Sequence, residues 1–458
     1  MKVYSFSKNG IRFEDSFAPE REHSSLAFLP EIAILPLSTE SGSRSLPIVS
    51  IGQHIEEGML IARKQDAGSS NIHSPIPGKL IKAIKWEPGE YFLSDALAIR
   101  LEGSFNRLGK LETKHEWTGL SQFEIKLLLE EYGVTEMDGL GRPLCDIFSQ
   151  YYTVKKPLTM VLKCVFDDPW LVADYCLCRE RMEAVAEGCM IAARASGAST
   201  VLLAVSAAEK ELGEALFAAA KQSAVSSMVT LLMVLVGSRY PQHSDYEMEA
   251  VLRKYEKKEG IALSDIMFLG PATMAAIYDA VALHTPALER YVAAGGSAVK
   301  HRVVVRARIG SRLRDIFAEC GGFCGKPDGA DSSIPSYAVI GSPLMGRVVS
   351  LDEPILKTSR GVFAFARKKQ APPIFKFMRN FLPEAACIGC GECRIVCPVE
   401  LDPEDLYKRI KNGKHDDSMI SLILRCIGCG CCETVCPSKL PLCTAIIRST
   451  FKGAASAV

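Results

Sequence analysis

Cysteine is the residue type in this sequence whose spacing predicts chemistry. The chain has 17 cysteines in 458 residues, and ten of them lie at or after Cys387. Eight of these ten form two runs of the pattern C-x2-C-x2-C-x3-C-P, which end at Pro398 and Pro437. Thiolates at this spacing are typical ligands of [4Fe–4S] clusters, because two-residue gaps let one loop wrap three corners of a cubane. The tail therefore predicts two such clusters.

The two runs are expected to exchange their fourth ligands. In bacterial two-cluster ferredoxins, which share this spacing, the last cysteine of each run ligates the other cluster. The predicted ligands of one cluster are Cys387, Cys390, Cys393 and Cys436, and those of the other are Cys426, Cys429, Cys432 and Cys397. Glycines inside the runs should permit the tight backbone path around each cluster. These glycines are Gly389, Gly391, Gly428 and Gly430.

Structural zinc is the alternative ligand for paired C-x2-C groups. Zinc needs four ligands at each site, whereas each run supplies three plus one and a trailing proline, so the pattern favours clusters. Cys431 occupies a spacer position and Cys443 follows the second run, and we predict that neither is a ligand. The seven earlier cysteines are not spaced as ligands, and we expect them to be buried free thiols.

Composition excludes several classes of protein. Hydrophobic residues make up 48% and charged residues 23%, as in folded soluble domains. The net charge of +1 predicts no nucleic-acid partner. The first ten residues lack the apolar core of an export signal, so a reducing cytosol without disulfides is expected. The most apolar stretch, 224–236, is shorter than the roughly 20 residues that span a bilayer, which predicts no transmembrane segment.

The elements around the cysteines predict a multidomain fold of α+β and α/β type. Short apolar stretches separated by glycine between 46 and 100 indicate strands and tight turns. From 120 to 290, strand-like runs alternate with helical periodicity, and Ser121 with Glu124 predicts a capping box. The predicted domains are a β-sandwich over 1–110, an α/β domain over 111–290, a β-grasp unit over 291–366, and a two-cluster ferredoxin-like helical domain over 367–458 that begins with a polar linker.

The order of these parts resembles the RnfC family, the C subunits of Rnf-type ion-translocating electron transport complexes. The motifs that carry the resemblance are His73-Ser-Pro-Ile-Pro-Gly, Tyr240-Pro-Gln, Gly270-Pro-Ala-Thr-Met-Ala-Ala-Ile-Tyr, Cys320-Gly-Gly-Phe, Gly341-Ser-Pro-Leu-Met-Gly and the tandem cysteine runs. The resemblance implies a lipoyl-like sandwich of the barrel-sandwich type and an α/β domain similar to the flavin subunit of complex I. It also implies an electron-transfer subunit of an ion-translocating ferredoxin:NAD oxidoreductase, peripheral to the cytoplasmic face of the membrane, that joins ferredoxin or NADH to membrane partners.

The same resemblance implies FMN and NADH in the α/β domain, where this sequence departs from the family pattern. The family loop has the form G-x-x-G-x-G-G-A-G-F-P-T, and here Glu136 and Asp138 stand at two of its glycine positions. Carboxylates repel phosphate, and a Cβ fills space that bare backbone leaves open. Phe166-Asp-Asp-Pro-Trp replaces E-C-E-P-Y, and His243 and Ser244 replace glycines after Tyr-Pro-Gln. Either flavin and NADH bind in an altered pocket, or the scaffold is retained with its pocket closed.

Two alternative functions stay open beside the Rnf-type subunit. One is a soluble flavin/iron–sulfur reductase similar to the cobalamin reductases, which share this order of domains. The other is a non-catalytic subunit that docks partners and only relays electrons. The sequence contains no recognisable nucleophile–base pair or paired-carboxylate site, so no catalytic residue is predicted.

Overall fold

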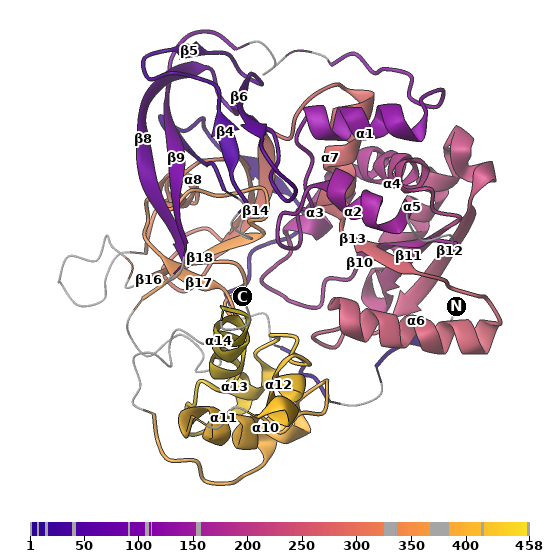
Figure 1. Ribbon diagram of the computed structural model, residues 1–458, viewed down its shortest axis with the longest axis vertical. Coiled ribbons are helices and arrows are strands. Elements are labelled where there is room, and N and C mark those ends of the chain that lie inside the picture. Colours follow the sequence, from indigo (N-terminus) through magenta and orange to yellow (C-terminus); the bar gives the residue numbers. More distant parts are fainter. Residues whose placement is uncertain are drawn as a thin grey trace.

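A computed structural model of the protein describes residues 2–6, 9–13, 17–38, 43–89, 92–105, 110, 112–152, 157–324, 335, 337–366, 384–413 and 416–455. Four units are visible in Figure 1: an indigo and purple β-sandwich, a magenta and pink α/β unit beside it, an orange sheet below the sandwich, and yellow helices at the bottom. The yellow helices carry the two cysteine runs, so the other three units are the scaffold on which they sit.

The N-terminal sandwich consists of two small sheets that face each other. One has the strand order β3 (Ile32–Pro36), β9 (Phe92–Leu101), β8 (Gly78–Gly89), β5 (His54–Ile55), and the other has the order β4 (Ser45–Pro47), β6 (Leu60–Lys64), β7 (Ile72–His73). Residues alternate between the core and the solvent along β3, so that Ala33 and Leu35 are buried with Ile61 and Leu97. This alternation is typical of a sheet with one wet face, as the glycine-separated strands predicted.

The second unit is a five-stranded parallel sheet with helices on both faces. The strand order is β1 (Val3–Tyr4), β12 (Thr230–Val236), β11 (Thr200–Ser206), β10 (Thr159–Cys164), β13 (Ile266–Leu269). Helix α6 (Asp245–Glu259) packs on one face through Met248, Val251 and Leu252. The other helices are α1 (Gln122–Glu131), α2 (Leu144–Tyr152), α3 (Ala173–Glu180), α4 (Met182–Ser196), α5 (Lys210–Gln222) and α7 (Pro271–Ala282), with short 3-10 turns η1 (Ala207–Glu209) and η2 (Ala224–Met228). Parallel strands buried between helices explain why these strands read as continuous apolar runs.

The predicted elements of this domain are present, with differences at helix ends. The capping box at Ser121 is confirmed, because its side chain accepts from Glu124 N and the Glu124 carboxylate accepts from Ser121 N. Between β10 and β11 the chain forms two separate helices, α3 and α4, which meet at Arg181. Helix α6 and strand β13 were not predicted at all.

The third unit is a mixed sheet crossed by one helix. Its strand order is β17 (Arg347–Val349), β16 (Tyr337–Ile340), β18 (Gly361–Phe365), β14 (Glu289–Gly295), β15 (Val303–Arg308), β2 (Ser24–Leu26). The central strands β14 and β18 are parallel, whereas β14–β15 and β16–β18 are antiparallel. Helix α8 (Leu313–Glu319) packs on this sheet through Leu313, Ile316 and Phe317.

The N-terminal residues do not stay within the sandwich that the sequence predicted over 1–110. Strand β1 pairs with β12 in the parallel sheet, and β2 pairs with β15 in the mixed sheet. The chain therefore contributes one strand each to the second and third units before it forms the first unit. Such pairing between residues far apart in sequence leaves no local pattern from which it could be predicted.

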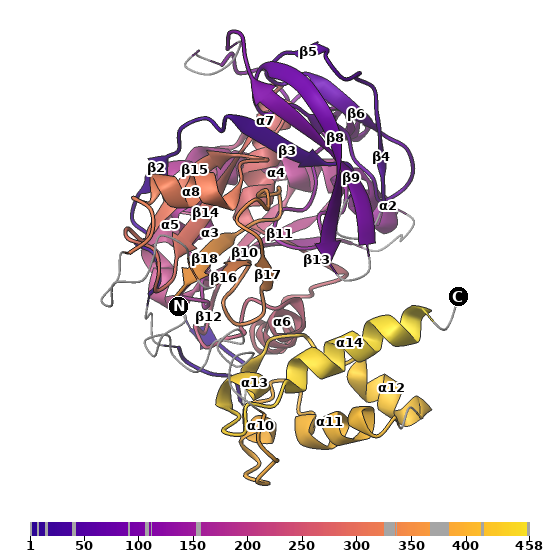
Figure 2. The same cartoon turned by 90° about the vertical axis from the view of Figure 1, so that its left-hand side faces the viewer.

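The C-terminal unit is made of short helices around the cysteine runs. They are α10 (Glu392–Ile395), α11 (Pro403–Lys411), α12 (Asp417–Ile423), α13 (Cys431–Val435) and α14 (Leu442–Ala455). Figure 2 shows them below α6 and below the sheet of β16 and β18. The linker predicted to open this domain lies in 367–383, outside the described residues. No helix in the described part of the chain is long and apolar enough to cross a bilayer.

Helix α4 contacts α7 so closely that only glycine fits at Gly188. A Cβ at Gly188 would lie 1.9 Å from the carbonyl oxygen of Met274 in α7. We expect Gly188→Ala to lower the free energy of unfolding by about 1–3 kcal/mol, because the two backbones must separate. Gly119→Ala is the control, since a Cβ there meets no atom within 4 Å. Thermal unfolding measures both; an unchanged midpoint for Gly188→Ala would contradict the close approach.

Candidate functional site

Both cysteine runs follow a backbone path that requires glycine. The φ angles are 67° at Gly389, 76° at Gly391, 69° at Gly428 and 75° at Gly430, all in the left-handed region that L side chains rarely adopt. Helix α10 begins directly after Gly391 and α13 directly after Gly430. The role predicted for these glycines is thereby confirmed, and each run curls before its helix leads away.

Three cysteines of the first run and one of the second face a common space. Cys387, Cys390, Cys393 and Cys436, which we call the outer set, line one small pocket together with Glu404. Cys387 and Cys390 are exposed, whereas Cys393 and Cys436 are buried. The outer set therefore gathers the cysteines that the exchange of fourth ligands would bring together.

The other four cysteines form a second group in the helical unit. Cys426, Cys429, Cys432 and Cys397 form the inner set: Cys397 interacts electrostatically with Cys426 and Cys429, and Cys432 with the same two. Cys443, predicted not to be a ligand, hydrogen-bonds with Cys426 and Cys432, and Cys431 with Cys429. Among the described residues, no three His, Cys, Asp or Glu side chains lie close enough to hold a single metal ion.

Burial favours the protonated form of two of these thiols, Cys393 and Cys397. Desolvation raises the pKa of Cys393 and of Cys397 to about 11. Since only the thiolate ligates iron, both groups must lose a proton when they bind it. Cysteine ligands at this spacing suit iron–sulfur clusters.

The inner set is pressed against the scaffold, whereas the outer set is not. Tyr240 Oη donates to the carbonyl oxygen of Cys429 at 2.8 Å, and Asn9 Nδ2 donates to that of Cys397 at 2.7 Å. The side chain of Met345 from the mixed sheet lies so near Gly430 that a Cβ there would be 2.6 Å from its sulfur. Contacts from two scaffold units therefore enclose the inner set on the side that faces the parallel sheet.

The carboxyl ends of the parallel strands, where α/β proteins bind ligands, carry a network of charges. Lys163, near the end of β10, has its Nζ 2.6 Å from Asp245 and 3.8 Å from Asp138. Burial lowers the pKa of Lys163, but the carboxylates of Asp138 and Asp245 outweigh it, so the pKa is raised. The lysine is therefore charged and held between two acids.

A second part of the network joins the α/β unit to the mixed sheet. The buried Asp174 carboxylate lies 3.2 Å from a guanidinium nitrogen of Arg290 and 3.2 Å from one of Arg360. Arg290 also donates to the carbonyl oxygen of Met137 at 3.3 Å. Two arginines from the mixed sheet are thus bound by one carboxylate from α3.

Two of the departures from the family pattern contact each other. His243 Nδ1 lies 2.7 Å from Asp167 Oδ1, and the backbone N–H of His243 donates to the other oxygen at 3.1 Å. The neighbouring Asp168 is buried, and desolvation raises the pKa of its carboxyl group. His243 therefore packs with the acidic stretch after β10, and its ring lies 5.4 Å from that of Tyr240.

Comparison with family models divides the chain in the same order. Residues 8–92 match the RnfC barrel sandwich hybrid domain, residues 129–279 match the Nuo51 FMN-binding domain, and residues 386–440 match a 4Fe-4S dicluster domain. The kind and order of these matches resemble the RnfC family. The dicluster match implies two iron–sulfur clusters in this chain.

Named relatives align with most of this chain. The C subunit of the proton-translocating ferredoxin:NAD(+) oxidoreductase complex of Clostridium ljungdahlii is 26% identical over 84% of this chain and 82% of its own length. The C subunit of the ion-translocating oxidoreductase complex of Rhodobacter capsulatus is 26% identical, with 84% and 71% covered. The C subunit of the Na(+)-translocating ferredoxin:NAD(+) oxidoreductase complex of Acetobacterium woodii is 25% identical, with 84% and 83% covered. A solved NAD+-reducing [NiFe]-hydrogenase aligns with 74% of this chain and 63% of its own at 15% identity and a TM-score of 0.48.

The residues of this chain fit clusters but do not fit flavin mononucleotide. Eight soft thiols in two groups suit the donor sets of two iron–sulfur clusters. In the α/β unit, however, a Cβ at Gly270 would lie 2.5 Å from a carboxylate oxygen of Asp138, and one at Gly139 would lie 2.5 Å from an oxygen of Glu136. Negative charge therefore fills the loop where a phosphate would need donors.

Several functional contacts could not be read from single residues. The sequence singled out Tyr240 as part of a family motif but gave no sign that it touches Cys429. Of the seven earlier cysteines, six are buried as expected, but Cys324 is exposed, and that part of the expectation is wrong. The exposed position follows from its place after Gly321 and Gly322, beyond the end of α8.

Proposed function

We propose that this chain is the C subunit of an ion-translocating ferredoxin:NAD+ oxidoreductase complex of the Rnf type. The observation that carries the proposal is the gathering of eight cysteines into two crossed sets, one of which is docked on a Nuo51-like α/β unit. The names of the relatives in Clostridium, Rhodobacter and Acetobacterium, which align with more than two thirds of their own length, support the same assignment.

The outer and inner sets are the proposed ligands of one [4Fe–4S] cluster each. Such clusters, when bound, accept and release one electron at a time. The chain's own residues hold the two sites in fixed positions: Tyr240 and Asn9 anchor the inner run, while the left-handed glycines shape both loops. This division leaves the outer set, with Cys387 and Cys390 exposed, as the site nearer to a docked redox partner.

The proposed scaffold consists of a barrel-sandwich domain, a Nuo51-like domain and a β-grasp domain. The order β15-β14-β18-β16, with a parallel central pair and a crossing helix α8, supports the β-grasp assignment of the third unit. The sandwich would hold the chain to partner subunits at the cytoplasmic face of a membrane. A soluble reductase of the cobalamin-reductase type is disfavoured, because it needs flavin in a loop that carries Glu136 and Asp138.

Isolation of the intact assembly tests this function. An affinity-tagged chain recovered from detergent-solubilised membranes under anaerobic conditions should bring membrane-spanning subunits with it and contain about eight irons per chain. Reduced ferredoxin should bleach the visible absorbance of these irons. Recovery of the chain alone with zinc in place of iron would contradict the cluster assignment, and recovery with iron but without membrane subunits would contradict the Rnf-type assembly.

A further inference from the structure

The loop between α1 and α2 carries an acidic group that behaves as a built-in ligand. The Asp138 carboxylate lies at the N-terminus of α7, where Thr273 Oγ1 donates to it at 3.3 Å. The same Thr273 oxygen accepts from the backbone N–H of Met137 at 3.0 Å, which fixes the loop against the helix. The N-terminus of a helix at the carboxyl edge of a parallel sheet is where α/β proteins bind phosphate groups. Here a side chain of the protein occupies that position.

The cationic side chains around this position are already paired with carboxylates of the same chain. Lys163 is bound by Asp138 and Asp245, whereas Arg290 and Arg360 share Asp174. A bound phosphate would have to displace a carboxylate from one of these ion pairs and leave that carboxylate buried without its partner. Such an exchange is costly, because a buried charge that has lost its ion-pair partner has neither hydration nor a counter-charge to stabilise it.

Glu136 closes the other side of the same loop. Its carboxylate lies over Gly139 and is 3.4 Å from Arg142 Nε. Desolvation and the charge of the neighbouring Asp138 both raise the pKa of Glu136. An anionic ligand would meet both of them at the point where related loops present bare glycine backbone.

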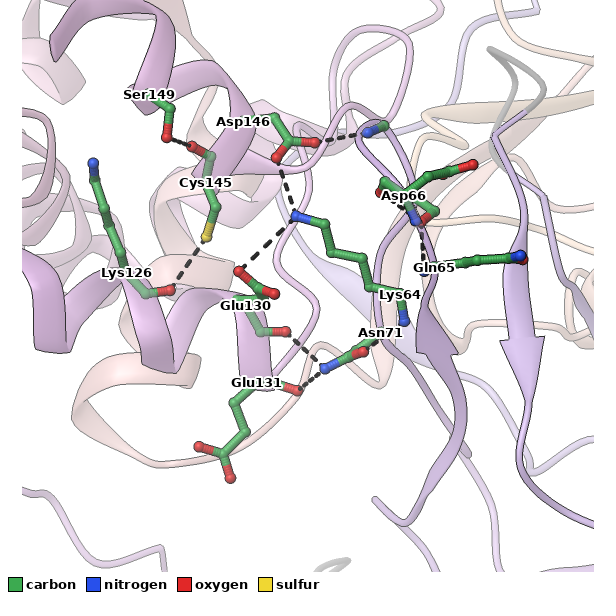
Figure 3. Close-up of polar contacts among 12 residues, drawn as sticks. Lys64, Gln65, Asp66, Asn71, Lys126, Glu130, Glu131, Cys145, Asp146 and Ser149 are labelled. Atoms are coloured by element: carbon green, nitrogen blue, oxygen red, sulfur yellow. Dashed lines mark hydrogen bonds and ion pairs between the residues drawn. The ribbon is translucent and has the colours of Figure 1, made fainter.

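The loop is also held at both ends by other domains. Figure 3 shows Lys64 of the sandwich reaching Asp146 at the start of α2, and Asn71 reaching the end of α1. Asn71 Nδ2 donates to the carbonyl oxygens of Glu130 and Glu131 at 3.0 and 3.2 Å. From the mixed sheet, Lys357 Nζ donates to the carbonyl oxygen of Gly133 at 2.6 Å. The loop cannot swing open without the loss of contacts to two other units.

We infer that the α/β unit of this chain takes neither FMN nor NADH, because Asp138 occupies its anion site as an internal ligand. The unit is then a scaffold that positions the inner cysteine set, and electrons must reach the chain from a redox partner that carries its own cofactor. The inference rests on the loop and its ion pairs, and it does not depend on the proposed place of the chain in an Rnf-type complex.

The first test is made on the unaltered, cluster-loaded protein. The full chain purified anaerobically, with about eight irons, is denatured to release any flavin, and separate samples are titrated with FMN and with NADH. We expect no flavin in the released fraction, no saturable quenching of FMN fluorescence, and no bleaching of the iron–sulfur absorbance by NADH. About one flavin per chain, or saturable binding of either compound, would overturn the inference.

The second test asks whether Asp138 itself prevents FMN from binding. Asp138→Gly removes both the charge and the volume of the side chain, whereas Asp138→Asn keeps the volume and removes only the charge. We expect FMN to bind Asp138→Gly tighter than the unaltered chain by roughly tenfold or more, with Asp138→Asn between them. Asp352→Asn, on the exposed surface, should behave as the unaltered chain. Iron content confirms that each variant is folded; equal or weaker FMN binding by a folded Asp138→Gly would contradict the role of Asp138.

Discussion

Replacement of Cys390 and Cys436 together by alanine should leave the protein with about four of its eight irons, because both belong to the outer set and only one cluster is lost. Replacement of Cys390 and Cys397 together should leave almost no iron, since these residues belong to different sets. If each run instead held its own cluster, the two results would be reversed. Iron and sulfide analysis of the anaerobically reconstituted proteins, with spectroscopy of the reduced clusters, distinguishes the two arrangements.

The controls for this experiment come from the same helical unit. Cys431 in α13 and Cys443 in α14 are buried, and both lie beside the inner set. Alanine at either position should leave about eight irons, since neither follows the ligand spacing. Loss of about four irons in the Cys443 variant, with none lost in a Cys397 variant, would assign Cys443 as the fourth ligand of the inner set.

Replacement of Asp174 by alanine should lower the free energy of unfolding by about 3–5 kcal/mol, because it leaves the buried guanidinium groups of Arg290 and Arg360 without the carboxylate that pairs with them. The side chains of Asp174 and Arg290 are each only 2% exposed, so water cannot take the place of the lost carboxylate. The arginines join α3 to the mixed sheet, and the contact between these two units should loosen first. Denaturant unfolding followed by the fluorescence of Trp117 and Trp170, both in the core of the α/β unit, measures the loss.

The surface of the protein offers a matched control for Asp174. Asp352 also lies between two arginines, 2.6 Å from Arg314 and 3.9 Å from Arg312, but its side chain is 56% exposed. Asp352→Ala should cost less than about 1 kcal/mol, since water screens the exposed pair. Equal losses in the two alanine variants would show that the Asp174 bridge is not desolvated as the structure indicates.

The cluster motifs could be predicted from sequence because their chemistry is local. Two-residue gaps between cysteines and glycine at fixed positions define a loop whose shape does not depend on the rest of the protein. The same is true of the capping box at Ser121 and of the alternation of strands and helices between 159 and 282. Only the exchange of the fourth cysteine requires the two runs to meet, and a known spacing already implies that meeting.

Helix α6 was missed although a local signal was present. Met248, Val251, Leu252 and Tyr255 recur at the spacing of one helical face, and all four are buried. The rest of the segment is strongly charged, which hid this narrow apolar stripe. The separation of α3 from α4 at Arg181 had no such signal, since no glycine or proline stands at the break.

The sequence by itself determined that the tail has the ligand pattern of two clusters, which eight cysteines make up that pattern, and that the scaffold belongs to a nucleotide-type α/β class. It also exposed Glu136 and Asp138 as departures, but it left open whether flavin binds beside them. Only the tertiary structure decided where these acids point, because Lys163, Thr273 and Gly270 come to Asp138 from separate segments of the chain. Ligand spacing is fixed by a few covalent bonds along the chain, whereas an ion network forms only when distant segments pack and exclude water.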